Sequence, residues 1–341
     1  MSEADPAAVK RYLLGRQMPP EIIDWKYFDE RFNRGRERGL VWVRGDEVAG
    51  FLGLIPFHTE KEGSRAECAW LCDWSIDPSQ GSGMGLMLLK RAGGLYDGLF
   101  NLGGNENTRQ IVPRLADRTV PDAAVNLVLP LRLGSVFARL PGGLVKRVLS
   151  QQKFLQHIPL RWVRPSGDPR VSIEPGLSVR VSSLVENLAG DCWRPLYDSE
   201  FVAWQLGRCP AITCWSCHSS SESPLRTAAL IWKSRSSKGF WRLAFCGATD
   251  DLEEISVLVR AVSAFVYRQR GIALFAIASH LEGDLIQLLA QRGFLRRRER
   301  LPFHVMRGRQ SGLPTDEFAA LSFLDTDMAY RFESEMNAPG A

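Results

Sequence analysis

The stretch Asp73–Leu89, which reads DWSIDPSQGSGMGLMLL, joins the end of an apolar segment to a glycine-rich turn and a helical pattern. Ala69–Ile76 is short, apolar and contains two tryptophans, as is typical of a buried strand. Asp77-Pro78 ends that strand, and the leucines from Leu86 onward recur on one side of a predicted helix. The stretch therefore predicts a strand, a tight turn and a helix, in that order.

The glycines of this turn allow a ligand to approach the backbone closely. Gly81, Gly83 and Gly85 have no side chains to block a bound group, and glycine readily takes a positive φ. The first N–H groups of the following helix carry partial positive charge, so the turn can hold a phosphate. The spacing differs from that of a P-loop and from the G-x-G-x-x-G of a dinucleotide fold. A tight turn without a ligand is the alternative.

The pattern Gln80-x-x-Gly83-x-Gly85, after a strand that ends in Asp-Pro, resembles the pyrophosphate loop of GNAT-family N-acyltransferases. The resemblance implies acyl-CoA, specifically acetyl-CoA, as a co-substrate, and no metal is expected. Asn107, at the start of a later predicted helix, matches an asparagine that the family places near the cofactor. The residues expected to contact the cofactor in the strand and turn are Ser75, Ile76, Gln80, Gly81, Ser82, Gly83, Met84 and Gly85.

The predicted elements extend this resemblance over both halves of the chain. Helices over 6–38 precede a hairpin, the strand and glycine turn, and further strands and helices up to 131, and much of that order recurs after 171. Phe294–Arg307 is expected to form a hairpin-like end. The fold class is thus α+β, with two GNAT-like domains, each a mixed, mostly antiparallel, splayed sheet flanked by helices. The predicted parts are a first domain at 1–131, a basic linker at 132–170, a second domain at 171–310 and a tail at 311–341.

In the second copy, the segment Cys246–Glu254, CGATDDLEE, stands where the first copy has its glycine turn. Its four acids lie at the N-terminus of a predicted helix, where they would repel a pyrophosphate. The second domain is therefore expected to be degenerate for CoA. It either helps to bind the acceptor or only supports the fold.

An acyltransferase must take a proton from the amine and polarise the thioester carbonyl. The resemblance places the splayed strand beside the thioester, so the backbone N–H of Ser75 or Ile76 is predicted to polarise the carbonyl. Asp73 and Glu67 are the candidate bases; being six positions apart on one strand, they are expected to share a face. Ordinary structural carboxylates are the alternative. Pro113–Arg118 lacks the tyrosine that many family members use as an acid, so the proton donor is unassigned.

Bulk properties exclude several classes of protein. The 341 residues carry a formal net charge of +5, which does not predict binding to nucleic acid. No apolar run approaches the roughly 20 residues that span a bilayer. Residues 1–8 include Glu3 and Asp5 and lack the apolar core of a signal peptide. A cytoplasmic location is therefore expected, and the seven cysteines are expected to be free thiols.

Residues 132–167 form a basic segment without Asp or Glu, in which apolar residues are interleaved. Leu133, Val136, Phe137 and Leu140 have the spacing of one helix face. A basic amphipathic helix can contact an anionic membrane surface. The alternative is a linker helix that packs its apolar face on a domain.

The cysteines and the histidine between 209 and 218 match two metal-binding patterns, and a plain strand is the alternative. Cys214–His218, CWSCH, matches a haem-attachment pattern, which requires export. Cys209, Cys214, Cys217 and His218 could form a zinc site, but their spacing is irregular. Adjacent strand residues also point to opposite faces, which separates Cys217 from His218. A half-buried strand with free thiols is the prediction.

Two classes of function follow from the sequence. The first is an N-acetyltransferase that acts on an amine acceptor, either a small molecule or an amino-sugar in a glycan precursor. The second is a non-catalytic tandem scaffold or a CoA-dependent sensor. The intact first loop favours the enzyme, and the missing acid and the degenerate second loop favour the scaffold. The sequence identifies neither the acceptor nor the oligomeric state.

Overall fold

The computed structural model describes residues 4–32, 35–61, 64–77, 79, 83–104, 106–132, 168–186, 194–196, 198–220, 224–235, 239–247 and 251–309. Most of the basic segment and the whole of the tail after 309 lie outside these residues, so the membrane contact predicted for 132–167 concerns a part that is not described. None of the described helices is both long and apolar enough to cross a bilayer.

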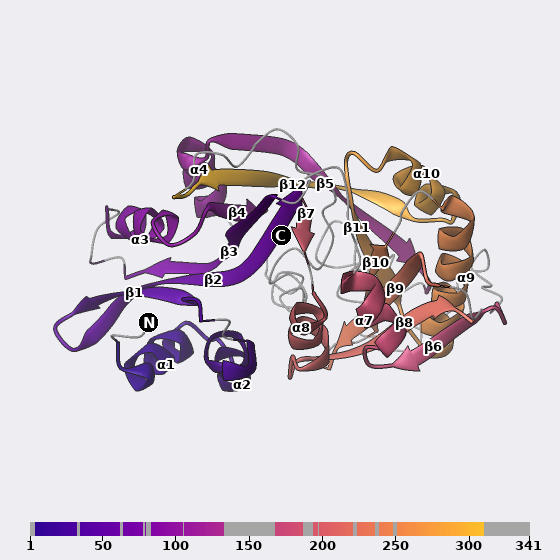
Figure 1. The fold of residues 1–341 in the computed structure, drawn as a ribbon, viewed down its shortest axis with the longest axis horizontal. Coiled ribbons are helices and arrows are strands. Elements are labelled where there is room, and N and C mark those ends of the chain that lie inside the picture. The colour runs from indigo at the N-terminus through magenta and orange to yellow at the C-terminus, as the bar shows by residue number, and fades with distance from the viewer. Residues whose placement is uncertain are drawn as a thin grey trace, which may run out of the picture.

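The described strands form one mixed sheet (Figure 1). Its twelve strands include β7 (Arg194–Leu196), which pairs with β2 outside the main path. Along the sheet the order of the others is β1 (Gly39–Arg44), β2 (Glu47–Lys61), β3 (Ser64–Ile76), β4 (Gly98–Leu102), β12 (Leu295–Arg307), β5 (Arg118–Pro130), β11 (Ala273–Ser279), β10 (Phe240–Gly247), β9 (Thr227–Ser234), β8 (Ile212–Ser219) and β6 (Val171–Pro175).

Helices cover both faces of the first half of this sheet (Figure 1). Alternate residues of a strand point to opposite faces. Leu52 and Leu54 of β2 join the core of α3, whereas Phe51 joins that of α1. The helices of the first half are α1 (Pro6–Gly15), α2 (Pro20–Ile23), the π-helical η1 (Asp24–Phe28), the short 3₁₀ turn η2 (Glu30–Phe32), α3 (Gly83–Gly93) and α4 (Glu106–Leu115).

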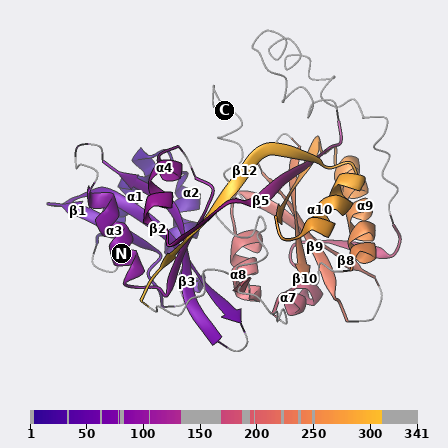
Figure 2. The ribbon, with the colours of Figure 1, turned by 90° about the horizontal axis from the view of Figure 1, so that it is seen from above.

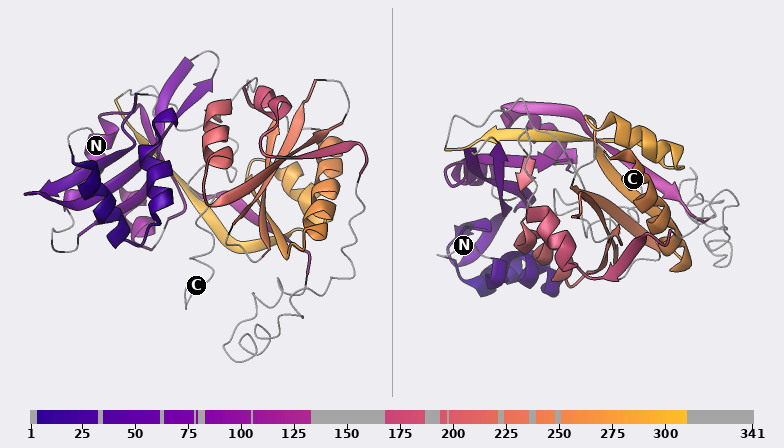
Figure 3. Two further views of the ribbon diagram at one scale, coloured as in Figure 1. Left: turned by 90° about the horizontal axis from the view of Figure 1, so that it is seen from below. Right: turned by 45° about the vertical axis from the view of Figure 1, so that its right-hand side comes forward.

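The second half repeats much of this arrangement. Its helices are α7 (Val179–Glu186), α8 (Ser199–Val202), the π-helical η5 (Ala203–Gly207), α9 (Leu252–Arg268) and α10 (Gly283–Gln291). Apolar residues of α9 recur on one face and pack with those of α10 against β9 to β11. Figure 3 shows the two helices on the same side of the sheet. The strand β6 has no counterpart among the described residues of the first half.

The last strand of each half lies beside strands of the other half. β5 follows α4 in sequence but pairs with β11, and β12 follows α10 but pairs with β4. β5 and β12 also pair with each other, so both cross the middle of the molecule (Figure 2). The two predicted domains therefore share one sheet, and the division at 131 and 171 stays a prediction. The hairpin predicted for Phe294–Arg307 is wrong: this segment forms one long strand with two register shifts.

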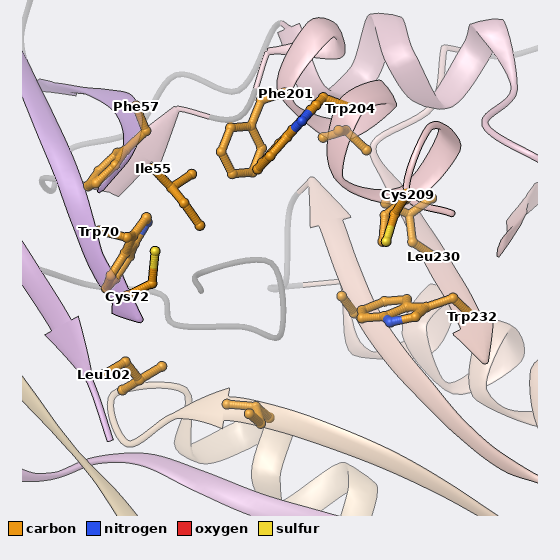
Figure 4. Packing of buried hydrophobic residues seen from close by; sticks show 14 of the residues in the cluster. Ile55, Phe57, Trp70, Cys72, Leu102, Phe201, Trp204, Cys209, Leu230 and Trp232 are labelled. Carbon is orange, nitrogen blue, oxygen red and sulfur yellow. The ribbon is translucent and has the colours of Figure 1, made fainter. Parts of the chain in front are cut away.

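A shared core joins the two halves around two tryptophans. Trp25 of η1 and Trp204 of η5 stack with ring centroids 4.6 Å apart. Each indole N–H donates to the other residue's carbonyl, at 2.9 and 3.1 Å. Figure 4 shows Phe201 and Trp204 beside Phe57 in this core, which buries side chains of both halves. Trp25-Lys26 and Trp204-Gln205 thus occupy equivalent places in the two halves.

Candidate functional site

In the first half, two parallel strands separate next to α3. β3 and β4 pair from Cys68 with Gly98 to Trp70 with Phe100. Beyond this point β3 continues to Ile76 and β4 to Leu102 without further pairing to each other, although β3 stays paired with β2 and β4 with β12. We call residues 71–76 of β3 and 101–102 of β4 the strand separation. This is the splayed geometry that the sequence predicted before the glycine turn.

A β-bulge interrupts β3 inside the strand separation. Cys72 pairs with Gly53 and Ser75 with Phe51, so two residues of β3 oppose one residue of β2. Asp73 has a φ of 48°, in the left-handed region that asparagine and aspartate tolerate better than most residues. Such a bulge bends its strand and re-aims the side chains and peptide groups around it. The bulge lies where the sequence predicts the reacting carbonyl.

After the bulge, the alternation of peptide groups distinguishes the Ser75 and Ile76 N–H groups, which are the two predicted to polarise that carbonyl. The Asp77 N–H donates to the Ala49 carbonyl of the β2 side at 2.8 Å. Because peptide groups alternate along an antiparallel strand, the Ser75 N–H also points towards β2, and the Ile76 N–H points away from it. Arg16 donates to the Ile76 carbonyl at 3.4 Å. Of the two, only Ile76 presents its N–H on the side from which β4 has withdrawn.

Asp73 does not face the side that the alternation predicts. Ala69 and Leu71 pack in the core of α3, and Asp73 would follow them there together with Glu67. Instead the carboxylate accepts hydrogen bonds from Lys26 and Tyr27 of η1, on the opposite side of the sheet. The positive φ at the bulge causes this turn. The expectation that the two candidate bases share a face is therefore wrong.

Glu67 lies in a separate ionic group. Its carboxylate contacts Arg36 and, at 3.6 Å, Arg309, and its side chain is 31 % exposed. The Glu67 N–H donates to an Asp97 carboxylate oxygen at 2.9 Å. The structure thus places the two predicted bases among different partners.

The N-terminus of α3 is open on its outer side. Among the described residues, Gly83 has no heavy atom within 4 Å of the position that a Cβ would occupy, whereas a Cβ at Gly85 would lie 3.0 Å from the Trp74 ring. The first turn contains no acid. Met84 lies between these glycines, in the same turn. The predicted contacts Gln80, Gly81 and Ser82, and the side chain of Asn107, lie outside what the structure describes.

The corresponding helix of the second half, α9, carries its own anions. Asp251 caps the helix by accepting from the Glu254 N–H at 3.0 Å, and Glu253 lies in the same turn. Burial, together with the charge of Asp251, raises the pKa of Glu254. The electrostatics at this helix start are therefore unfavourable for a phosphate, in agreement with the expectation from the sequence.

A buried polar pair lies at the start of the strand separation. Asn101 of β4 is the Cα partner of His304 of β12, and the two side chains are 8 % and 1 % exposed. The imidazole Nδ1 bonds the Thr119 hydroxyl at 2.9 Å, and burial lowers the pKa of His304. No local sequence signal predicts this pair, because it depends on β12 lying beside β4.

The thiols of the second half do not converge on one point. Cys214 packs in the core shared by both halves, and Cys217 packs in the core of α9 on the other face of β8. Burial raises the pKa of Cys209 to about 11 and also raises the pKa of Cys214. Among the described residues no group of His, Cys, Asp and Glu is arranged to hold a metal. One ion therefore cannot bind both Cys214 and Cys217.

Comparison with known proteins identifies the fold. No protein-family model matches the sequence, and no curated protein matches it. A GCN5-related N-acetyltransferase structure from Anabaena variabilis is 14 % identical, with a TM-score of 0.50, over 88 % of this chain and 71 % of that one. Saccharomyces cerevisiae N-myristoyltransferase with bound myristoyl-CoA and inhibitors is 9 % identical, with a TM-score of 0.51, over 91 % of this chain and 75 % of that one.

A tandem GNAT protein from the clavulanic acid biosynthesis pathway is 13 % identical, with a TM-score of 0.51, over 89 % of this chain and 94 % of that one. At such identities the likeness shows the fold alone. It confirms the fold class predicted from the sequence, an α+β architecture with two GNAT-like copies.

Proposed function

We propose that this chain, a tandem GNAT-fold protein, transfers an acyl group from acyl-CoA to an amine, with the donor bound by its first half. The observation that carries the proposal is the strand separation beside the open N-terminus of α3. A helix start with free space and no acid suits a pyrophosphate. The gap in pairing between β3 and β4 suits the extended arm of the same molecule.

The proposed roles follow the chain through this site. Gly83, Met84 and Gly85, with Gln80–Ser82 before them, hold the pyrophosphate of the donor. The Ile76 N–H polarises the thioester carbonyl, since a donor aimed at developing negative charge stabilises the transition state. Asn107 lies near the donor. Asp73 and Glu67 are the proposed carboxylates for the acceptor amine.

The acyl group and the acceptor are finer proposals. Structures of this fold include both an N-acetyltransferase and an N-myristoyltransferase, so the fold leaves the chain length open. We propose acetyl-CoA as the donor and an amine such as an amino-sugar of a glycan precursor as the acceptor. The basic residues of 132–167 and the tandem build motivate this acceptor and a peripheral contact with anionic membrane.

A CoA-dependent sensor is the second candidate function. It is favoured by the acid-capped start of α9 and by the absence of a tyrosine from Pro113–Arg118, where many members of the family carry their acid. A sensor needs the donor site but no proton transfer. Binding and turnover therefore separate the two functions.

The test measures binding first and turnover second. Thermal shift and calorimetry with acetyl-CoA and longer acyl-CoAs should show binding. Release of free CoA thiol should then follow in the presence of some amines from a panel that includes amino-sugars. Binding without thiol release from any amine would support the sensor, and absence of binding would overturn the proposed donor site.

A further inference from the structure

The Asp73 carboxylate belongs to a buried polar cluster formed with Lys26 and Tyr27, which we call the Lys26–Tyr27–Asp73 cluster. The Lys26 ammonium and the Tyr27 hydroxyl both donate to Oδ2 of Asp73. The side chains of Lys26 and Asp73 are 0 % and 4 % exposed. Tyr27 also lies 3.6 Å from the Cys72 thiol on the preceding residue of β3. The cluster therefore connects η1 to the bulge of β3.

Two neighbouring residues of the first half, Arg38 and Gly53, support this cluster. Arg38 donates to the carbonyls of Lys26 and Trp25 and so fixes the segment that carries the cluster. Burial lowers the pKa of Arg38 to about 10. On β2, Gly53 faces the bulge, and a Cβ there would overlap the Tyr27 hydroxyl and lie 2.8 Å from the Cys72 sulfur. The absence of a side chain at Gly53 makes room for Tyr27.

The placement of these groups favours a role different from that of a base. Oδ2 of Asp73 already accepts from an ammonium and a phenol, which reduces its capacity to accept a proton from an amine. A buried ion pair usually contributes little net stability, so its presence calls for another explanation. The position of the ion pair supplies that explanation, because Asp73 itself has a positive φ. A strained backbone conformation persists only where its surroundings hold it.

We propose that the Lys26–Tyr27–Asp73 cluster is a positioning device that fixes the bulge of β3, and with it the Ile76 N–H that faces the donor carbonyl. Asp73 then acts through its own backbone and need not touch the acceptor. This inference rests on the proposed acyl transfer and replaces the base role of Asp73 within it. It predicts that Tyr27, which contributes no base, matters for turnover as much as Asp73 does.

The experiment compares two buried tyrosines of the same half. Tyr27→Phe removes the hydroxyl that holds Asp73. Tyr96→Phe is the matched control, because Tyr96 is also buried and its hydroxyl donates to the Glu37 carbonyl and not to a member of the cluster. Tyr27→Phe should lower kcat by about 10²-fold, the usual effect of a small misplacement, and leave KM for acyl-CoA nearly unchanged. Tyr96→Phe should change stability without changing kcat.

A second variant keeps the test independent of folding. Lys26→Met with Asp73→Asn removes both charges together, so no unpaired charge stays buried. This double variant should be as slow as Tyr27→Phe, and its deficit should be the same at pH 7 and pH 9. A base role for Asp73 predicts the opposite, a deficit that shrinks at high pH as solvent supplies the free amine.

The outcomes separate this inference from the proposed function. A wild-type protein that binds acyl-CoA and releases no thiol would overturn acyl transfer and this inference with it. An active wild type with full kcat in Tyr27→Phe, or a deficit that recovers at pH 9 in the double variant, would overturn the positioning role alone.

Discussion

The first and second halves of the molecule each contain a pair of parallel strands that separate towards a helix N-terminus. In the first half, β3 is bulged at Asp73 and the start of α3 has no acid. In the second half, β10 pairs with β9 from Trp241 to Gly247 without a register shift, and α9 begins with its own acids. The shared scaffold therefore does not define a site; the local backbone and the charge at the helix start do.

Buried polar side chains differ between the halves in the same way. By the stacked tryptophans, Lys26 corresponds to Gln205, which is also buried but uncharged. Counted from the first paired residue of each strand, Asn101 corresponds to Ala276, whose partner in β5 is Leu127. The polar pair Asn101–His304 is thus apolar in the second half. Buried polar groups cost free energy unless they are bonded, and the second half buries others of its own, such as His218 and Arg242. At these two matched positions, however, the buried charge and the polar pair occur only in the half that is expected to function.

The largest contrast is expected for the buried ammonium. Lys26→Met should lower the free energy of unfolding by about 3–5 kcal/mol, because it leaves the Asp73 carboxylate buried without its cation. Gln205→Met, the matched change in the second half, should cost about 1 kcal/mol. Urea denaturation of both variants measures the difference. Equal losses would show that the cluster adds nothing that its counterpart lacks.

The next effect concerns the start of α3. Gly83→Asp should weaken acyl-CoA binding by at least ~2–3 kcal/mol, because it adds an anion where the phosphate is proposed to lie. The space around Gly83 is open and an acid suits a helix N-terminus, so the variant should fold. Gly283→Asp adds the same charge at the open start of α10 and should leave affinity unchanged. Calorimetry that finds identical affinity for Gly83→Asp and wild type would remove α3 from the site.

A titration tests the asymmetry without any substitution. The acids at the start of α9 should prevent a second donor site, so calorimetry should give one acyl-CoA per chain. Neutralising Glu253 and Glu254 with Gln should leave this stoichiometry unchanged as long as Asp251 caps the helix. Two equal sites would mean that the acids of α9 do not exclude the donor.

The sequence predicts the parts of this site that depend on neighbouring residues. The strand and α3 follow from local pattern, and so does the acidic start of α9. The bulge was not predicted, because one extra residue in a strand leaves no signature when Asp73 and Trp74 fit a regular strand equally well. The sequence thus predicts the wrong face for the Asp73 side chain, and the role of this residue stays a prediction.

Features that depend on residues distant in the sequence could not be predicted for a related reason. The hairpin expected at Phe294–Arg307 is one strand because β5 pairs along most of its length and β4 pairs with its C-terminal end, and both are distant in sequence. The proximity of Lys26 and Tyr27 to Asp73 likewise depends on how η1 packs on the sheet. The alternation of residues along a strand predicts which side chains share a face, but it does not predict which other strands or helices lie beside them.

The smallest expected effect tests the polar pair at the strand separation. Burial lowers the pKa of His304, so the folded state binds fewer protons on this imidazole than the unfolded state, whose ordinary pKa is ~6.5. The stabilising contribution of neutral His304 is therefore present above that pKa and is lost as the pH falls through it. The free energy of unfolding should decrease from pH 7 to pH 5. Asn101→Ala with His304→Leu, which copies Ala276 and Leu127, should flatten this decrease.

Denaturation curves at a series of pH values measure the slope. The control is Asn101→Ala alone, which keeps the His304 imidazole and its bond to Thr119, so its free energy of unfolding should still decrease from pH 7 to pH 5. Other groups also titrate in this range, but they are common to all three proteins, so the difference between the curves isolates His304. If the double variant keeps the wild-type slope, His304 is protonated as easily in the folded chain as in the unfolded one. The polar pair would then differ from its apolar counterpart in composition and not in energetics.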